Sequence, residues 1–367
     1  MIVDGINYQS IWVDEEDPTV VRVIDQLRLP FFFEIKKLGS ANDIYNAISD
    51  MTVRGAPLIG AAGAFGVYLA ALDSVRYKDP LPRIEAAARH LISCRPTAAN
   101  LAWAVNFTLN NLRGKGESLS RKALKSALEI CEIEKANCRR IGNYGLTLIE
   151  SASKKKNGAA VNILTHCNAG WLACIDYGTV LSSVYFAHDA GIPVHVWVDE
   201  TRPRNQGARL TAWELENANV PYTLITDNAG GHLMQHGMVD LVIVGCDRAT
   251  RRGDVANKIG TYLKALAAHD NKIPFYSAFP SSSFDFEISN GIREIPVEER
   301  DPEEVTTVSG ISDGKITSIR ICPEHCTAAN FGFDVTPAKY ITGLITERGI
   351  CLPLEKDIKE MFSDKFI

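Results

Sequence analysis

The spacing of apolar residues changes near the middle of the chain. Up to residue 150, apolar side chains recur at helical intervals, most clearly in SANDIYNAISDM (40–51) and SLSRKALKSALEICEIEKANCRRIGNYGLTLIE (118–150). Only SIWV (10–13) and FFFEIKKL (31–38) have the character of strands in this region. The pattern therefore predicts a mostly helical N-terminal domain over residues 1–150.

A different pattern begins at residue 151. SASKKKNGAA (151–160) has no periodicity and is predicted to be a loop at the domain boundary. Short apolar and β-branched runs follow, most of them separated by helical patterns: VNILTH (161–166), VHVWVD (194–199), YTLIT (222–226), LVIVG (241–245) and IPFYSAF (273–279). Strands that alternate with helices predict a parallel sheet covered on both faces. We therefore predict an α/β chain in which residues 151–367 form a Rossmann-like, doubly wound parallel sheet domain.

One uncharged stretch needs a separate interpretation. APLIGAAGAFGVYLAAL (56–72) carries no charge over 17 residues. A membrane span needs about 20 predominantly apolar residues, and this stretch is shorter and rich in Gly and Ala. Pro57 also suits the first turn of a helix. We predict a helix buried on all sides and no contact with a membrane.

Composition excludes several classes of protein. The 39 Lys and Arg residues against 44 Asp and Glu residues give a net charge of -5, so no broad basic field exists for nucleic acid. Nine cysteines without a signal-peptide pattern are typical of reduced thiols, and we expect a cytoplasmic protein. No G-x-G-x-x-G or G-x-x-x-x-G-K-[ST] follows a predicted strand, so the standard dinucleotide and P-loop signatures are missing.

Polar and reactive residues follow the predicted strands directly. The first strand leads into Cys167, and the fourth leads into Cys246 and Asp247. Further polar residues come after the second strand and in a predicted loop before the next helix: Glu200, Thr201, Arg202, Arg204, Gln206, Asn257 and Lys258. In a doubly wound sheet these strand ends converge. Together with Arg54 and Arg95, which stand beside prolines at apparent helix starts, they predict an anion site, most commonly for phosphate.

Each reactive residue has an alternative interpretation. Asp247 is either a partly desolvated acid or a helix N-cap. Cys167 is either a small buried filler or a base or nucleophile activated by a helix N-terminus and nearby cations. His166 points to the opposite face of its strand and is not expected to pair with Cys167. The segment CPEHC (322–326) lacks a second ligand cluster, so we predict no metal site.

Seven motifs stand in order over nearly the whole chain: RGAPLIG, CRPTAANL, LTHCNAG, DETRPRNQGARLTAWEL, GCDR, GDVANKIGTY and FDVTP. Together they resemble the family of 5-methylthioribose-1-phosphate isomerases. This family is shared with ribose-1,5-bisphosphate isomerases and with the regulatory subunits of the exchange factor for eukaryotic initiation factor two. The resemblance implies an aldose–ketose isomerase of methionine salvage that takes a small phosphorylated sugar. It also implies a homodimer of chains with a helical N-terminal domain and a Rossmann-like C-terminal domain.

The resemblance also implies roles for particular residues. Cys167 and Asp247 match the catalytic pair of the family. Substrate contacts are implied at Arg54, Gly55, Ala56, Arg95, Gln206, Asn257 and Lys258. The chain departs from the family where Cys246 replaces the usual alanine, where Asn205 replaces an apolar residue, and where NFGFDVTP replaces NPAFDVTP. None of these departures removes a proposed catalytic group.

The chemistry fits this pair without a cofactor. Because O1 of the substrate is phosphorylated, a general acid must assist departure of the ring oxygen, and Asp247 is the candidate. Hydrogen then moves from C2 to C1, either as a proton with Cys167 as base or as a hydride with Cys167 stabilising charge. Trp171, Phe65 or Trp103 is expected to supply an apolar wall for the methylthio group. The alternatives are an isomerase of ribose 1,5-bisphosphate or 5-deoxyribose 1-phosphate, and a non-catalytic regulatory subunit on the same fold.

Overall fold

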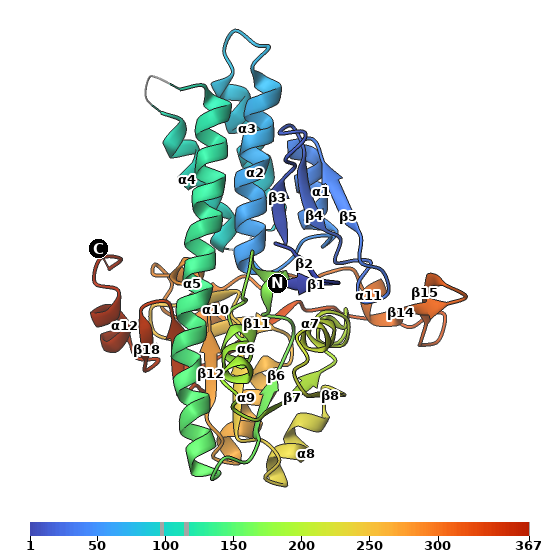
Figure 1. Cartoon of the computed structure of the whole chain (residues 1–367), viewed down its shortest axis with the longest axis vertical. Coiled ribbons are helices and arrows are strands. Elements are labelled where there is room, and N and C mark those ends of the chain that lie inside the picture. Colours follow the sequence, from blue (N-terminus) through green and yellow to red (C-terminus); the bar gives the residue numbers. More distant parts are fainter. Residues whose placement is uncertain (96–98, 114–116, 367) are drawn as a thin grey trace.

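The computed structural model describes residues 1–95, 99–113 and 117–366. Its N-terminal part consists mainly of helices that pack side by side (Figure 1): α1 (Ala41–Ser49), α2 (Ala56–Ser74), α3 (Leu81–Ser93), α4 (Ala99–Leu112) and α5 (Leu119–Lys155). A short hairpin and a three-stranded antiparallel sheet precede them: β1 (Ile2–Val3), β2 (Ile6–Asn7), β3 (Ile11–Val13), β4 (Val21–Ile24) and β5 (Ile35–Leu38). The two strand-like stretches expected near the start of the chain are thus confirmed as β3 and β5.

The second half of the chain is built around a seven-stranded sheet with the order β18-β17-β12-β9-β6-β7-β8. Its strands are β6 (Val161–Thr165), β7 (Val194–Asp199), β8 (Tyr222–Ile225), β9 (Leu241–Val244), β12 (Phe275–Ala278), β17 (Gly343–Thr346) and β18 (Gly349–Cys351). All neighbours are parallel except the edge pair β17 and β18. The parallel strands follow the 3-2-1-4-5-6 order of a doubly wound sheet, which reverses its winding between β6 and β9. The predicted fold class is confirmed.

Helices cover both faces of this sheet. In β9, Leu241 and Ile243 pack into a core with α6 (Leu181–Asp189), α7 (Ala212–Asn217) and the C-terminal half of α5. Val242 and Val244 pack into the opposite core with α8 (Ala229–Gln235), α9 (Thr261–Asp270) and α12 (Glu355–Met361). A strand that is covered on both faces buries every side chain, which explains why LVIVG reads as an unbroken apolar run.

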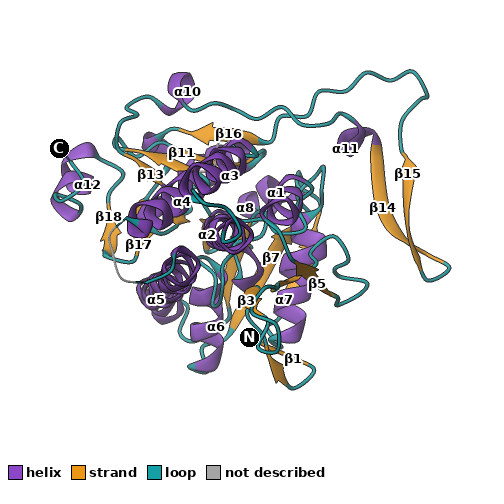
Figure 2. Ribbon diagram, turned by 90° about the horizontal axis from the view of Figure 1, so that it is seen from above, coloured by secondary structure: helices purple, strands orange, loops and turns teal. Residues whose placement is uncertain are grey.

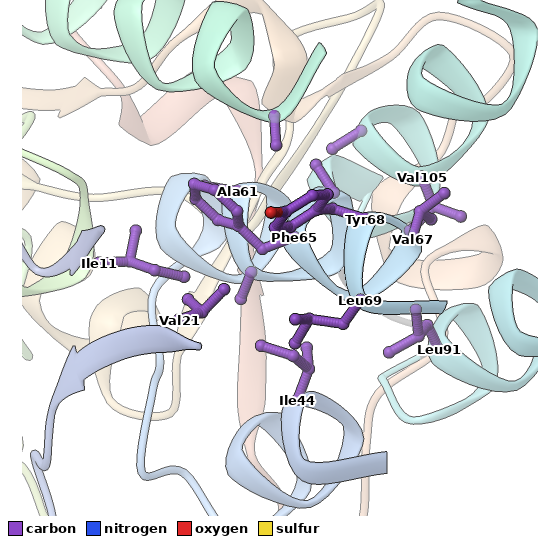
Figure 3. Close-up of a cluster of buried hydrophobic side chains, with 14 of the residues drawn as sticks. Ile11, Val21, Ile44, Ala61, Phe65, Val67, Tyr68, Leu69, Leu91 and Val105 are labelled. Atoms are coloured by element: carbon purple, nitrogen blue, oxygen red, sulfur yellow. The ribbon is translucent and has the colours of Figure 1, made fainter. Parts of the chain in front are cut away.

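Helix α2 forms the centre of the N-terminal core (Figure 3). Seventeen of its nineteen residues are buried, and α1, α3, α4 and α5 all contact it. Among the described residues it is the one helix long and apolar enough to cross a membrane, but 89% of its apolar window is buried inside the protein. The side chains of Phe65 and Leu69 pack there with Ile44 of α1 and with neighbouring helices. The prediction of a helix buried on all sides is confirmed.

Helix α5 runs through both halves of the molecule (Figure 1). Its first half packs in the N-terminal core, and its second half packs on the large sheet. The loop predicted for 151–160 is wrong over residues 151–155, which continue the helix to Lys155. Alanine and lysine favour helix, and Lys154 and Lys155 carry positive charge where the helix dipole is negative. The chain turns only at Asn157 and Gly158, which have positive φ values of 53° and 84°. A domain division at residue 150 stays a prediction.

The sequence patterns did not predict the remaining strands. A smaller sheet has the order β13-β10-β11-β16, with β10 (Arg248–Thr250), β11 (Val255–Lys258), β13 (Phe284–Asp285) and β16 (Phe333–Thr336). The segment after β9, expected to be a loop, is therefore the hairpin of β10 and β11. A second hairpin, β14 (Thr307–Ser312) with β15 (Lys315–Arg320), projects from the body of the molecule (Figure 2).

A buried acid lies where α5 meets the loop after β12. Glu134 is 1% exposed; its Oε1 accepts a hydrogen bond from Ser282 Oγ at 3.0 Å, and its Oε2 has no partner among the described residues. Burial, with a smaller contribution from the charge of Glu347, raises the pKa of Glu134 to about 7. A carboxyl with a raised pKa stabilises the folded state below its ordinary pKa, and this contribution is lost as the pH rises through the raised value.

We therefore expect Glu134→Gln to remove part of the pH dependence of stability. The difference in free energy of unfolding between the variant and the wild type should shift in favour of the variant by on the order of 2 kcal/mol as the pH rises from about 5 to about 8. Urea unfolding at both pH values measures the difference. Glu129→Gln, an exposed position on the same helix, is the matched control. A difference between Glu134→Gln and wild type that stays constant with pH contradicts the prediction.

Candidate active site

A pocket opens at the carboxyl ends of β6 and β9, the neighbouring strands between which the winding of the sheet reverses. The loop after β6, the loop after β9, the start of α2 and the end of β11 all contribute to its wall. Six of the predicted site residues line it: Arg54, Gly55, Ala56, Cys167, Asp247 and Asn257. Segments far apart in the sequence therefore meet at the edge where ligands bind in doubly wound folds.

Cys167 follows β6 in the left-handed backbone region, with a φ of 67°. Its N–H donates to Thr201 Oγ1 at 2.8 Å, and its carbonyl oxygen accepts from Thr211 Oγ1 at 2.7 Å. The residue is 9% exposed and lines the pocket. The next regular element is a short 3-10 turn (Trp171–Ala173), so the thiol does not lie at the N-terminus of an α-helix. Two backbone hydrogen bonds therefore hold Cys167 in place, and no α-helix begins directly after it.

His166 is directed away from the thiol. Its Nδ1 lies 2.8 Å from Asp199 Oδ2, and its Nε2 lies 2.8 Å from the carbonyl oxygen of Ile259. Both ring nitrogens are thus engaged with other partners. His166 is therefore not available to Cys167 as a base, as expected. The reason differs from the expected strand alternation, because β6 ends at Thr165 and both residues follow it.

His166 belongs instead to a small charged cluster. His166, Asp199 and Asp227 are close enough to hold a metal ion. However, Lys264 Nζ lies 3.2 Å from Asp199 Oδ2 and donates to the carbonyl oxygen of Asp227, so an ammonium group already supplies the positive charge. The segment 322–326 forms no comparable cluster within the described residues. A reaction without metal stays a prediction.

Asp247 is the acid of the pocket. Its side chain is partly buried and makes no hydrogen bond within the described part of the chain. Burial raises the pKa of this carboxyl, while the positive charges of Lys258, Arg95 and Arg54 oppose the rise. The residue is followed by β10, so the helix N-cap alternative is wrong. A free carboxyl that keeps its proton to higher pH than an exposed aspartate has the property of a general acid.

Arg54 and Lys258 are buried cations, 9% and 6% exposed, that have no acidic partner within 4 Å among the described residues. Arg54 donates from Nη1 to Asn168 Oδ1 at 2.6 Å and from Nη2 to the Asn168 carbonyl at 2.7 Å. Lys258 donates to the carbonyl oxygen of Gly332 at 2.9 Å and lies over the ring of Phe333. Burial lowers the pKa of Lys258. Because buried charges are normally paired, these two cations predict an anionic ligand.

The start of α2 adds further positive potential. Gly55 precedes the helix with a φ of 97°, and a Cβ at this position would collide with the carbonyl of Ala173. Pro57 stands in the first turn, which lines the pocket, so the positive end of the helix dipole lies beside Arg54. In the related motif CRPTAANL, residues 96–98 lie outside the described part of the chain.

The remaining predicted residues lie close by. Arg95 is 7% exposed and pairs with Glu298 (Nη2 to Oε2, 3.3 Å), and its charge also acts on Asp247. Gln206 lines a neighbouring cavity that shares Arg54 with the pocket. The structure thus gathers the predicted residues in or beside one pocket, while their individual roles stay predictions.

The expected apolar wall is wrong in detail. Phe65 and Trp103 pack in the N-terminal core, and Trp171 packs in the core on one face of the large sheet. None of the three is among the described residues that line the pocket. Phe279 and Pro280 line it instead, because the loop after β12 reaches the same edge of the sheet.

A buried network behind Arg54 was not predicted. Asn168, which accepts from Arg54, donates from Nδ2 to Glu214 Oε1 at 2.9 Å. Glu214 is fully buried and also accepts from two backbone N–H groups of the turn Trp171–Ala173 and from the hydroxyl of Tyr185. All these partners donate to the carboxylate. Glu214 therefore positions Asn168, and through it the guanidinium of Arg54.

We expect Glu214→Gln to lower the free energy of unfolding by about 2 kcal/mol, since one carboxylate oxygen becomes an NH₂ group that faces donors. The affinity for inorganic phosphate should also fall, because Arg54 loses its support. Urea unfolding and phosphate titration measure the two effects. Glu216→Gln, at an exposed position of the same helix, is the control. Stability equal to that of the control would show that the network does not hold this site.

The fold and the site together define a class: a doubly wound α/β protein whose switch-point pocket brings a carboxyl and a thiol together with buried cations. The model of the initiation factor 2 subunit family matches residues 52–353. The chain therefore belongs to the initiation factor 2 subunit family. It is 55% identical to the methylthioribose-1-phosphate isomerase of Desulfatibacillum aliphaticivorans and 54% identical to that of Brucella anthropi, in both cases over 100% of each chain.

Solved structures agree with this assignment. The 5-methylthioribose 1-phosphate isomerase of Pyrococcus horikoshii OT3 matches with a TM-score of 0.82 and 39% identity, over 98% of this chain and 97% of that one. The delta subunit of translation initiation factor 2B from A. fulgidus matches with a TM-score of 0.78 and 37% identity, over 97% of this chain and 100% of that one. The family thus includes proteins named as enzymes and proteins named as translation factors.

Proposed function

We propose that this chain is an aldose–ketose isomerase that converts 5-methylthioribose 1-phosphate to 5-methylthioribulose 1-phosphate in methionine salvage. The observation that carries the proposal is a pocket lined by the buried cation Arg54, by the carboxyl of Asp247 with its raised pKa and by the thiol of Cys167. The buried Lys258 lies close enough for its charge to act on Asp247. The 55% identity with a full-length methylthioribose-1-phosphate isomerase supports the substrate.

In the first step, ring opening, the cations bind the phosphate and Asp247 protonates the ring oxygen. The phosphate binds where Arg54, Lys258 and the start of α2 offer positive charge without an acidic partner. Asp247 in its protonated form donates to the ring oxygen as the ring opens, because the phosphorylated O1 cannot release a proton itself. Burial favours that protonated form. The bond between C1 and the ring oxygen breaks in this step. It leaves an ionised Asp247 and an open-chain sugar with a positive charge shared between C1 and the phosphorylated O1.

The second step moves hydrogen from C2 to C1. In the proton route, Cys167 removes the proton from C2 and an enol forms between C1 and C2. The ionised Asp247 then takes the proton of the C2 hydroxyl to give the enolate, and Cys167 returns a proton to C1 as the C2 ketone forms. In the hydride route, hydrogen moves with its electron pair from C2 to the positively charged C1, and the C2 hydroxyl gives its proton to the ionised Asp247 as the ketone forms. Cys167 stabilises the charge and orients the sugar. The location of Cys167 in the same pocket as Asp247 is compatible with both routes.

Two other functions are weighed against this proposal. A ribose 1,5-bisphosphate isomerase needs cations for a second phosphate, whereas Phe279 and Pro280 give the pocket an apolar side that suits a methylthio group. A regulatory subunit is the alternative favoured by the 37% identity with the A. fulgidus protein. Such a subunit has no need of an unbonded acid and a thiol at one pocket, so catalysis is the better account.

Proton NMR of the protein with 5-methylthioribose 1-phosphate in deuterated water, without added cofactor, tests the function. Formation of the ketose is expected. Deuterium at C1 of the product would favour the proton route, and retention of the C2 hydrogen would favour hydride transfer or a shielded base. If no ketose forms, the proposal fails. Turnover of ribose 1,5-bisphosphate would then support a ribose 1,5-bisphosphate isomerase, and binding of translation factors would support a regulatory subunit.

The proposal also includes a homodimer in the cytoplasm, without cofactor, nucleic acid or membrane as partner. The family resemblance supports the dimer, and the net charge of -5 argues against nucleic acid. Sedimentation equilibrium tests the dimer, because one chain has a mass of 40.3 kDa. A particle of that mass at working concentrations would exclude it.

A further inference from the structure

A second cavity adjoins the pocket and shares Arg54 with it. Gln26 and Gln206 line this cavity, and each is 4% exposed. The Oε1 atom of each is buried and has no hydrogen-bond partner in the described part of the protein. An unpaired buried carbonyl costs about 1–3 kcal/mol, so two of them at one cavity indicate a donor that the chain itself does not supply.

The orientation of Gln26 is fixed by the protein. Its Nε2 donates to the carbonyl oxygen of Leu172 at 2.7 Å, and its backbone N–H donates to the carbonyl of Thr52 at 3.1 Å. Because the carbonyl of Leu172 can only accept, the amide nitrogen must face it, and Oε1 is left on the other side. Leu172 is itself held by a hydrogen bond from its N–H to Glu214 at 3.1 Å. The free acceptor of Gln26 is therefore preorganised.

The cationic side chains around this cavity are engaged elsewhere. Arg209 donates to the carbonyl oxygens of Leu27 and Leu29. Arg204 donates to Glu304 at 2.7 Å, and Arg54 donates to Asn168. None of them reaches the amide oxygens of the two glutamines. The cavity therefore presents acceptors to a ligand.

We propose that Gln26 Oε1 accepts a hydrogen bond from a ring hydroxyl of the sugar, with Gln206 as a second acceptor in the same cavity. This inference rests on the proposed function. Of the substrate's groups, only the hydroxyls donate, whereas the ionised phosphate and the thioether can only accept. Gln26 thus fixes the sugar with its hydroxyls toward the cavity and its phosphate toward the cations. It also selects against a deoxy sugar, since a missing hydroxyl leaves a buried oxygen unpaired.

The test compares Gln26→Met with the wild type. The KM for 5-methylthioribose 1-phosphate is measured, together with the inhibition constants of its 2-deoxy and 3-deoxy analogues and of inorganic phosphate. Gln26→Asn, which keeps an amide but draws its oxygen back by one methylene, is the second variant. Gln235→Met, at an exposed position on α8, is the control.

We expect Gln26→Met to raise the KM about tenfold, the loss of one hydrogen bond to a buried group, and to leave phosphate inhibition unchanged. One of the two deoxy analogues should bind wild type and Gln26→Met equally, because it lacks the hydroxyl that donates a hydrogen bond to Gln26. If Gln26→Met weakens the binding of phosphate and of both deoxy analogues to the same extent, Gln26 only supports Leu172. If the KM is unchanged, no hydroxyl reaches Gln26. Either result overturns the inference. If the wild type turns over none of the sugar phosphates, the proposed function fails instead.

Discussion

Asp247→Asn is expected to lower turnover by on the order of a hundredfold or more, because asparagine keeps the size of the side chain but has no proton to transfer to the ring oxygen. Binding of inorganic phosphate should be no weaker than in the wild type, since the substitution removes only an acid beside Arg54 and Lys258. Steady-state kinetics with the sugar phosphate and phosphate titration measure the two effects. Asp270→Asn, exposed at the end of α9, is the control.

The pH dependence of this variant has a defined sign. Burial raises the pKa of Asp247, so the acid is competent at low pH and is lost as the pH rises through the raised pKa. Wild-type turnover should therefore fall on the alkaline side, and the residual turnover of Asp247→Asn should lack that fall. The same raised pKa stabilises the fold below the ordinary pKa of aspartate and loses this contribution as the pH rises, so the variant should gain relative stability with pH.

Two results would remove Asp247 from the role of acid. Near-wild-type turnover in Asp247→Asn is the first. An alkaline fall that persists unchanged in the variant is the second, and it would assign the titration to another group. A loss of phosphate binding together with turnover would instead indicate damage to the cation site around Arg54.

The sequence predicted five of the seven strands of the large sheet because these strands carry their own signal, whereas β17 and β18 at one edge were missed. LVIVG is unbroken and apolar because both faces of β9 are covered. The smaller sheet has no such signal: β11 reads VANK, and two of its four residues are the polar site residues Asn257 and Lys258. The end of α5 was missed because SASKK is polar, although nothing in it breaks a helix before Gly158. Short polar strands and polar helix ends are decided by tertiary contacts.

The site shows the same division. Cys167 and Asp247 were predictable because each follows an apolar strand at the edge where ligands bind. The partnership of Asn168 and Glu214 was not, because 46 residues separate them and only the fold brings them together. Gln26 escaped notice for the same reason, since its free acceptor is defined by its contact with Leu172, 146 residues away. Supporting residues of a site are therefore found in the structure more readily than in the motifs.

Cys167→Ser is expected to lower turnover by on the order of a hundredfold or more while the protein stays folded. The hydrogen bonds of Cys167 to Thr201 and Thr211 involve its backbone, so serine can keep both of them. A hydroxyl is a far weaker acid than a thiol and is less polarisable, so it neither removes a proton from C2 nor spreads charge as sulfur does. Turnover and deuterium uptake from deuterated water are measured together. Cys351→Ser is the matched control, because Cys351 is also 9% exposed and lies in β18 at the edge of the sheet.

The combination of the two readouts separates the possible roles of the thiol. If the wild type incorporates deuterium at C1 and Cys167→Ser loses both turnover and incorporation, the thiol acts in the proton route. If the product of the wild-type enzyme retains the C2 hydrogen of the substrate and Cys167→Ser still loses turnover, two roles fit. The thiol either stabilises charge or positions the sugar during hydride transfer, or it acts as a base that is shielded from solvent. Near-wild-type turnover in Cys167→Ser would show that Cys167 is only a small buried residue that fills space. Asp247 would then be the reactive group of the pocket.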